Sequence, residues 1–481
     1  MKYQPIIGME VHIELHTRSK MFCGCSAEFF GVAPNTNVCP VCLGMPGTLP
    51  VINQKAVEYT IMTGLALNCD IQPHNVFARK NYFYPDLPKG YQISQYELPL
   101  CLNGYVNIDS GDESKRIRVR RVHLEEDTGK LTHVDDHSLV DLNRAGVPLM
   151  EIVTEADLRS AEESFAYVSK LRQLVRYLGV STGDMEKGAM RCEVNLSLQD
   201  VDTGKWGTKV EIKNLNSFRA VRNAIAYEIE RQMKVLNEGG VIEQTTRGWD
   251  ETRGVTFLQR SKEGDTGYRY FPEPDLPPLN LDPAWIEQIK TGLPELPDAK
   301  LARYTNDFGL TRKEAAVLAE DMAVAAYYES VVAAAQKSAG VTPKLISNWV
   351  AGELFRLLSE QGQDISTLKI KPEHLVALIE LVNANTVNQP AAKKVFGVMF
   401  DTGRPPQAIV EELGLQQISS ADQLTALVQQ VIADNADAVA QFKAGKETTL
   451  KFLVGQVMRA SRGKANPQVA EQMLKENLVR S

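Results

Sequence analysis

The chain has 481 residues, which is enough for roughly two to four domains with at least one sizeable core. Its composition, 43% hydrophobic and 23% charged with 33 Gly and 23 Pro, excludes disordered and collagen-like chains. With 53 Lys and Arg against 60 Asp and Glu, the net charge of −7 argues against nucleic-acid binding, unless positive charge is concentrated locally. The first residues show no signal-peptide pattern, and no apolar run is long enough to span a membrane, so we expect a cytoplasmic protein.

The first informative pattern is an alternation in residues 8–16. Apolar residues occupy the odd positions, and Glu, His, Glu and His occupy positions 10, 12, 14 and 16. A strand would therefore present one apolar face and one row of titratable groups. Glu10 and His12 suit a divalent cation such as magnesium, while a solvated edge strand is the alternative.

Four of the seven cysteines form two close pairs, Cys23 with Cys25 and Cys39 with Cys42, and 13 residues separate the pairs. This spacing can close four thiolates around a tetrahedral zinc ion. Four protein ligands leave no open position, so the predicted zinc is structural; free buried thiols are the alternative. The odd number of cysteines favours a reducing compartment.

A segment rich in aromatic residues, 81–91, lies beside three cations, Arg79, Lys80 and Lys89. Aromatic faces next to cations suit a nucleotide or a single-stranded acceptor end, and Tyr82 is one candidate contact. A packed aromatic loop explains the pattern equally well. The sequence contains no Walker-type loop, so bound ATP would not be held in that way.

Two further strands carry charge. Residues 115–121 contain five cations and run into the acids Glu125, Glu126 and Asp127. Residues 139–143 and 149–153 predict a hairpin that places Glu151 among apolar neighbours. A buried glutamate needs a metal or a cation, or it serves as an interior salt-bridge partner.

Helical periodicity predicts one helix from Ser160 to Gly179 and another from Ser217 to Gly239. Five prolines in residues 272–283 predict a rigid extended connector. Beyond it the chain is helical, with a break at residues 404–406. We therefore predict an α+β fold with three domains: a mixed domain over 1–290, an all-α domain over 291–405 and a small all-α tail over 406–481.

The tail has an uneven charge distribution. Residues 440–481 contain eight Lys or Arg and three Glu, a local net charge of +5. This favours a phosphate-contacting module, while an ordinary solvated helical face remains the alternative. The candidate contacts are Lys451, Arg459, Arg462 and Lys464.

Several longer motifs together resemble a known family. The chain is similar to the B subunit of the tRNA-dependent amidotransferases along its whole length. The motifs that carry the resemblance are residues 7–12 (IGMEVH), 38–47 (VCPVCLGMPG), 80–91 (KNYFYPDLPKGY), 141–151 (DLNRAGVPLME), 213–218 (KNLNSF), 268–272 (YRYFP), 455–458 (GQVM) and 463–467 (GKANP).

The resemblance implies a heterotrimeric amidotransferase that converts misacylated Glu-tRNA(Gln) or Asp-tRNA(Asn) to the amide. The A subunit, a glutaminase, would release ammonia from glutamine, and the C subunit is a small partner. The B subunit would bind tRNA in a cradle-shaped first domain and tail, and activate the carboxylate with ATP and magnesium as an acyl phosphate. Glu10, His12, Glu125 and Glu151 match the family's catalytic metal site.

A rival hypothesis is a tRNA-binding scaffold that presents substrate to a catalytic partner. The choice between Glu-tRNA and Asp-tRNA is left open, because it depends on which misacylating synthetase accompanies the protein.

Overall fold

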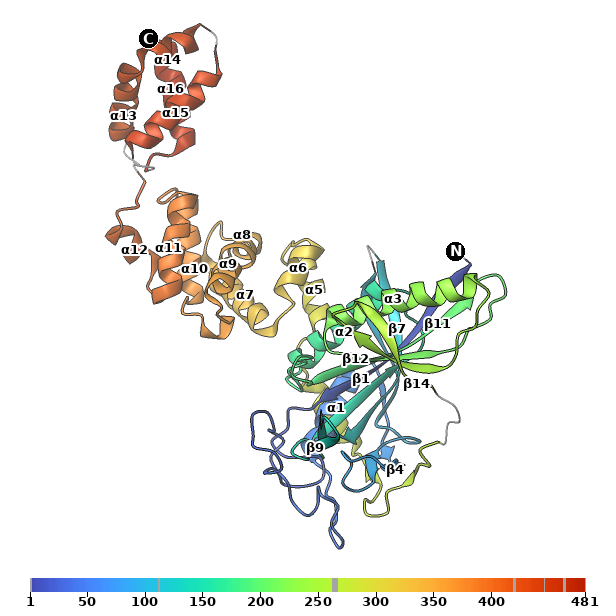
Figure 1. The fold of residues 1–481 in the computed structure, drawn as a ribbon. Helices are drawn as coiled ribbons and strands as arrows, with labels where there is room; N and C mark the ends of the chain where they lie inside the picture. The colour runs from blue at the N-terminus through green and yellow to red at the C-terminus, as the bar shows by residue number, and fades with distance from the viewer. Residues whose placement is uncertain are drawn as a thin grey trace. The chain divides into compact units, whose positions relative to one another are not determined.

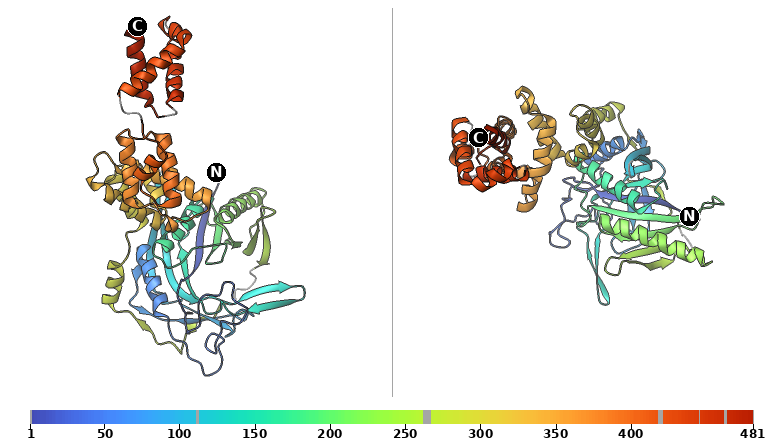
Figure 2. Two further views of the ribbon diagram at one scale, coloured as in Figure 1. Left: turned by 90° about the vertical axis from the view of Figure 1, so that its left-hand side faces the viewer. Right: turned by 90° about the horizontal axis from the view of Figure 1, so that it is seen from above.

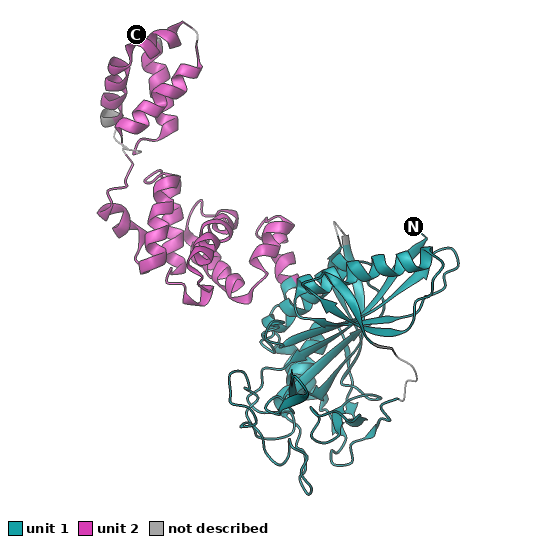
Figure 3. Ribbon diagram, viewed as in Figure 1, with its two compact units in different colours: residues 1–297 teal, residues 298–481 magenta. Residues whose placement is uncertain are grey.

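The structure is a computed structural model that describes residues 2–110, 113–261, 267–417, 421–444, 446–461 and 464–480. The chain divides into two compact units (Figure 3). Unit 1 comprises residues 1–297 and unit 2 comprises residues 298–481. We describe each unit by itself.

Unit 1 contains a nine-stranded sheet with the order β14-β13-β12-β11-β1-β10-β7-β6-β2. Neighbouring strands are antiparallel except β12 and β13, which are parallel. A three-stranded sheet has the order β15-β4-β5. Two further sheets have two strands each, β16 with β3 and β8 with β9. The strands are β1 (Tyr3–Glu14), β2 (Asp70–Ile71), β3 (His74–Asn75), β4 (Ala78–Asn81), β5 (Tyr91–Ser94), β6 (Cys101–Ser110), β7 (Glu113–Glu126), β8 (Lys130–Val134), β9 (His137–Asp141), β10 (Pro148–Thr154), β11 (Met190–Asp200), β12 (Val210–Leu215), β13 (Thr245–Asp250), β14 (Val255–Ser261), β15 (Phe271–Pro272) and β16 (Leu279–Asn280).

The described residues of unit 1 form four helices, and each begins after a side chain that caps it. The helices are α1 (Gln54–Ala66), α2 (Ala161–Tyr177), α3 (Phe218–Asn237) and α4 (Pro283–Thr291). Ser160 and Ser217 accept hydrogen bonds from backbone N–H groups in the first turns of α2 and α3, so both predicted helices are confirmed. Helix α2 contacts β6, α3 contacts β11 and the two helices contact each other (Figure 1).

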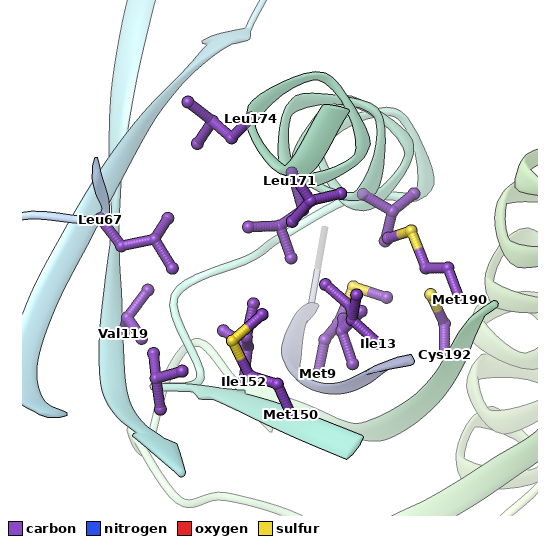
Figure 4. Close-up of a cluster of buried hydrophobic side chains, with 14 of the residues drawn as sticks. Met9, Ile13, Leu67, Val119, Met150, Ile152, Leu171, Leu174, Met190 and Cys192 are labelled. Carbon is purple, nitrogen blue, oxygen red and sulfur yellow. The ribbon is translucent and has the colours of Figure 1, made fainter. Parts of the chain in front are cut away.

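The core of unit 1 lies between the sheet and these helices. Met9, Val11 and Ile13 of β1 are at most 1% exposed, which confirms the predicted alternation of the first strand. Met150 and Ile152 of β10 lie in the same core, beneath side chains of α2 (Figure 4). One face of the sheet is thus fixed by packing, and the titratable residues of β1 and β10 occupy the other face.

The predicted hairpin of residues 139–153 is wrong. Strand β9 pairs with β8 in a separate two-stranded sheet, which extends away from the main sheet (Figure 2). Strand β10 instead lies between β1 and β7, and both of its edges are hydrogen-bonded to them. The two apolar neighbours of Glu151 are buried in the core, so long-range pairing replaces the local hairpin.

The proline-rich segment is not a connector between domains. Two short strands within it, β15 and β16, pair with β4 and β3, and Leu276 and Leu281 are buried in the core of unit 1. Prolines tolerate edge strands and the first turn of a helix, and Pro283 begins α4. The segment is therefore part of unit 1, where it pairs with strands from the first hundred residues.

The regular elements among the described residues of unit 2 are all helices. The helices are α5 (Pro297–Asn306, which starts at the last residue of unit 1), α6 (Arg312–Leu318), α7 (Met322–Ala334), α8 (Pro343–Asn348), a π-helix (Trp349–Leu354), α9 (Phe355–Gln361), α10 (Pro372–Asn383), α11 (Gln389–Thr402), α12 (Pro406–Glu412), α13 (Ala421–Asp434), α14 (Ala436–Lys443), α15 (Thr448–Ala460) and α16 (Pro467–Arg480), with short 3-10 turns at Ala335–Lys337 and Ile365–Thr367. The predicted α+β fold class, a mixed region followed by an all-α region, is confirmed.

Unit 2 contains two hydrophobic clusters. One extends from Tyr304 to Val410, and the other extends from Leu424 to Leu478. Helix α12 begins at Pro406, directly after Pro405, and contributes Ile409 and Val410 to the first cluster, so it packs with the helices before it. In the described part of the chain, no helix is long and apolar enough to cross a membrane.

Candidate active site

The candidate site lies on the polar face of the sheet, where three neighbouring strands align their titratable residues. His12 of β1 is paired with Glu151 of β10, and Glu151 is paired with His123 of β7. Side chains that lie directly opposite on antiparallel strands share a face, so this register forms a continuous row. Glu125, two residues beyond His123, lies on the same face of β7.

His12, Glu125 and Glu151 form a group with convergent ligand atoms. The Nε2 atom of His12 lies 3.5 Å from a carboxylate oxygen of Glu125 and 3.8 Å from one of Glu151. One ligand atom from each of the three residues lies within 4.8 Å of the others. Two buried carboxylates repel each other unless a cation lies between them, and two oxygens with one nitrogen suit magnesium or manganese.

Glu10 lies on the same face as this group but outside the set of mutually close ligand atoms. Asn195 donates a 2.9 Å hydrogen bond to its carboxylate. Burial raises the pKa of Glu10, and the negative charges of Glu151 and Glu193 raise it further. Glu10 therefore adds negative potential beside the three convergent ligands, and its part in metal binding stays a prediction.

His123 is a residue of the site that sequence reasoning missed. Its Nε2 atom lies 3.2 Å from a carboxylate oxygen of Glu151, and its imidazole is 2% exposed. Burial would raise the pKa of Glu151, but His123, His12 and Lys80 together hold it below its ordinary value. The sequence held one signal for it: the apolar Val122 and Leu124 alternate with polar residues at 121, 123 and 125, which places His123 on the same strand face as Glu125.

The predicted nucleotide-binding residues have different environments. The Nζ atom of Lys80 lies 5.0 Å from the centre of the Tyr268 ring, and the ring of Tyr82 packs against the same tyrosine at 5.8 Å. Burial lowers the pKa of Lys80, but Glu125 and Glu151 outweigh it and raise the pKa above its ordinary value. The negative charges of Glu125 and Glu151 therefore act on Lys80.

Arg79 and Lys89 are engaged in ion pairs. Arg79 binds Glu273 through two hydrogen bonds of 2.7 and 2.8 Å, and Glu273 is 2% exposed. The Nζ atom of Lys89 lies 2.6 Å from the buried carboxylate of Glu126. Both cations stabilise buried acids, and their contacts with a nucleotide stay predictions.

A second network of charged residues surrounds Asp127 and includes Glu14 at the end of β1. Arg191 donates a 2.6 Å hydrogen bond to Asp127, and the guanidinium of Arg144 lies 3.6 Å from the same carboxylate. Burial and the charge of Asp127 raise the pKa of Glu14 to about 8. These contacts fix the strand ends beside the candidate metal group.

The four predicted zinc ligands come together. Cys23, Cys25, Cys39 and Cys42 place their sulfur atoms within 4.8 Å of one another, so this cluster can bind a structural metal. A hydrogen bond with Cys23 lowers the pKa of Cys42 to about 4, and the backbone N–H of Cys39 and the nearby Lys20 act in the same direction. Lys20 is 1% exposed, and its Nζ atom lies 3.7 Å from the sulfur of Cys42. A buried cation beside thiolates fits the net negative charge of a four-cysteine zinc site.

The described residues among the predicted tRNA contacts lie in α15 and just before α16. Lys451 and Arg459 are exposed on α15, and Lys464 is partly exposed before α16. Arg462 lies outside the described residues. All four stay predictions.

The row of carboxylates and histidines, with cations and aromatic rings beside it, is an arrangement typical of enzymes that handle a metal-bound phosphate. Comparison with known proteins gives matches to two family models. A family model described as "GatB/GatE catalytic domain" matches residues 5–287, and one described as "GatB domain" matches residues 326–478.

Curated relatives match the whole chain. The B subunit of aspartyl/glutamyl-tRNA(Asn/Gln) amidotransferase from Roseiflexus castenholzii is 53% identical, with 100% of both chains covered. The protein of the same name from Persephonella marina is 51% identical over 99% of this chain and 100% of its own. That of Thermodesulfovibrio yellowstonii is 51% identical over 98% of this chain and 99% of its own. The chain therefore belongs to the family of B subunits of tRNA-dependent amidotransferases, and the resemblance seen in the sequence is confirmed.

The ion pair of Arg79 generates a stability prediction. Arg79→Met leaves the buried Glu273 without its partner, so we expect the free energy of unfolding to fall by about 3 kcal/mol. Urea denaturation measures the change. The exposed pair of Arg120 and Glu155 provides the control, since Arg120→Met should cost less than about 1 kcal/mol. Equal losses in the two variants would show that Arg79 is not a structural cation.

Proposed function

We propose that this chain is the tRNA-binding and carboxylate-activating subunit of a heterotrimeric amidotransferase. Its substrates would be misacylated Glu-tRNA(Gln), Asp-tRNA(Asn) or both, which the complex converts to the amide. The observation that carries the proposal is the convergence of His12, Glu125 and Glu151 in a chain that belongs to the B-subunit family. The partners would be the A subunit, which is a glutaminase, and the small C subunit, and the location would be the cytoplasm.

The chemistry follows from the weakness of a carboxylate as an electrophile. In the proposed first step, a side-chain carboxylate oxygen of the aminoacyl group attacks the γ-phosphorus of ATP, and ADP leaves. In the second step, ammonia supplied by the glutaminase attacks the acyl carbon, and inorganic phosphate leaves. An acyl phosphate is thus the intermediate that makes amide formation possible at neutral pH.

His12, Glu125 and Glu151, with Glu10 beside them, would hold magnesium in this site. When bound, the ion neutralises charge on the transferring phosphoryl group. His123 would keep Glu151 ionised and oriented, because it contacts the carboxylate at 3.2 Å and is itself buried. Ser94 would orient Glu125, since its hydroxyl lies 3.2 Å from the carboxylate.

The carboxylates generate the central prediction. Glu10→Gln and Glu151→Gln should each lower the hydrolysis of ATP that depends on Glu-tRNA and magnesium, Glu151→Gln by about 100-fold or more. Phosphate release by the reconstituted complex measures this activity. Glu243→Gln, which alters an exposed glutamate of unit 1, should leave the rate unchanged. If both site variants kept the full rate, the chain would be a tRNA-binding scaffold.

The four-cysteine cluster is proposed to hold structural zinc, which gives a second prediction. The purified chain should contain about one zinc ion, and Cys42→Ser should lower both the zinc content and the thermal unfolding temperature. Elemental analysis under reducing conditions provides the readout. Cys69→Ser is the matched control, because Cys69 is buried and lies outside the cluster. A zinc content near zero in the unaltered protein would contradict the proposal.

The tail of the chain, with Lys451, Arg459, Arg462 and Lys464, is proposed to contact tRNA phosphates. The sequence predicts a domain boundary at residue 406, but a truncation after residue 417 keeps α12 with the helices it packs against. We expect this truncation to weaken tRNA binding and to reduce its dependence on salt.

A substitution series sharpens this prediction. Replacing Lys451, Arg459 and Lys464 by Gln should reduce the slope of log K against log salt by about 2 to 3, because each phosphate contact contributes roughly 0.7–0.9. Filter binding at several salt concentrations measures the slope. Replacing the exposed Lys313, Lys371 and Lys394 by Gln removes the same charge elsewhere in unit 2. Identical slopes for the two triple variants would rule out the tail as the phosphate-contacting element.

A further inference from the structure

We propose that Arg121 binds a phosphoryl group of the nucleotide beside the His12, Glu125 and Glu151 group, with Lys80 as the second cation. The inference rests on the proposed function, because it names the residue that grips the substrate of the activation step. Arg121 is not among the metal, nucleotide or tRNA ligands predicted from the sequence.

A local irregularity of β7 places Arg121 on the site. The register between β7 and β10 shifts at Val153 and Thr154, where an extra residue enters β7. As a result Val119 and Val122 are both buried in the core, although they are three residues apart. Such a bulge redirects side chains, and Arg121 now shares the polar face with His123 and Glu125.

Arg121 differs from the other four cations of its strand. Lys115, Arg118 and Arg120 form ion pairs with Glu163, Asp157 and Glu155, and Arg116 is exposed over the Tyr105 ring. Arg121 forms no ion pair within the described parts of the chain, and its Nε atom is buried without a hydrogen-bond partner. A buried donor without an acceptor is costly, so this guanidinium is suited to an anion that arrives from solution.

The surroundings of Arg121 join it to the metal group. Its guanidinium lies 5.9 Å from the centre of the Tyr96 ring, which stacks on Tyr270 at 4.0 Å with an interplanar angle of 6°. Burial raises the pKa of Tyr270 to about 12, and Glu125 and Glu151 add to this while Lys80 and Arg121 oppose it. The charges of both cations and both carboxylates therefore act on Tyr270.

Lys80 and Arg121 share one property that the other cations near the site lack. Arg191, Lys213 and Lys89 are each within 4 Å of a carboxylate. Lys80 and Arg121 have no such partner among the described residues. Two cations without a carboxylate partner would neutralise charge on a phosphoryl group near the carboxylates that would hold the metal ion, and the planar guanidinium can donate two hydrogen bonds to one phosphate. A phosphodiester of the tRNA acceptor end offers the same chemistry, and the experiment separates the two sources.

The test uses the reconstituted complex with Arg121→Met, Arg121→Lys and the control Arg116→Met. The control removes an arginine from the same strand that also lies over a tyrosine ring. Two affinities are measured separately, one for a non-hydrolysable ATP analogue with magnesium and one for tRNA. We expect Arg121→Met to weaken binding of the analogue by about 10- to 100-fold, with Arg121→Lys intermediate and tRNA affinity unchanged.

The proposal is overturned if Arg121→Met and Arg116→Met bind the analogue equally well. It is also overturned if Arg121→Met loses affinity for tRNA alone, because the anion would then belong to the tRNA backbone. Thermal unfolding of each complex checks that the variants fold, and Arg121→Lys keeps the charge in place. Failure of the proposed function is visible in the unaltered complex, as an absence of ATP hydrolysis dependent on Glu-tRNA.

Discussion

Two buried carboxylates that face the same small space impose the main constraint on unit 1. Glu125 is 1% exposed and Glu151 is 6% exposed, and both approach the imidazole of His12. The two carboxylates repel each other. Packing on the opposite face of the sheet, where Met150 and Ile152 are buried in the core, keeps the strands that carry them in place. Part of the packing stability of the fold thus offsets the cost of keeping acidic groups together, as sites that bind cations require.

The positions of the cations follow the same logic. Three basic side chains of unit 1 pair with buried acids: Arg191 with Asp127, Lys89 with Glu126 and Arg79 with Glu273. These pairs hold the loops and strand ends around the site in one arrangement. Lys80 and Arg121 remain available for an anion, and a bulge in β7 is the reason that Arg121 points to the polar face.

The four-cysteine cluster and the basic tail are more local features. The four cysteines lie in a segment without regular secondary structure. The backbone N–H of Asn37 in this segment donates a 2.7 Å hydrogen bond to the side chain of Asn143, in the turn after β9. A metal ion would order such a segment where a hydrophobic core does not reach it. In the tail, a separate hydrophobic cluster allows α13, α15 and α16 to present charged residues without altering the rest of unit 2.

The sequence determined the features that depend on local order. Alternation fixed the two faces of β1, helical spacing and serine caps fixed α2 and α3, and the cysteine spacing identified the cluster. The family followed from long motifs in the same order along the chain. Each of these signals involves residues that are close together in the chain, where side-chain periodicity and backbone capping act directly.

Only the tertiary structure decided which distant residues meet. The pairing of β10 with β1 and β7 replaced the expected hairpin, and it brought His123 to Glu151. The proline-rich segment returned across unit 1 because its leucines bury in that core. Strand pairing and burial depend on the whole chain, so they place His12, Glu151 and Arg121 in one site although no local pattern joins them.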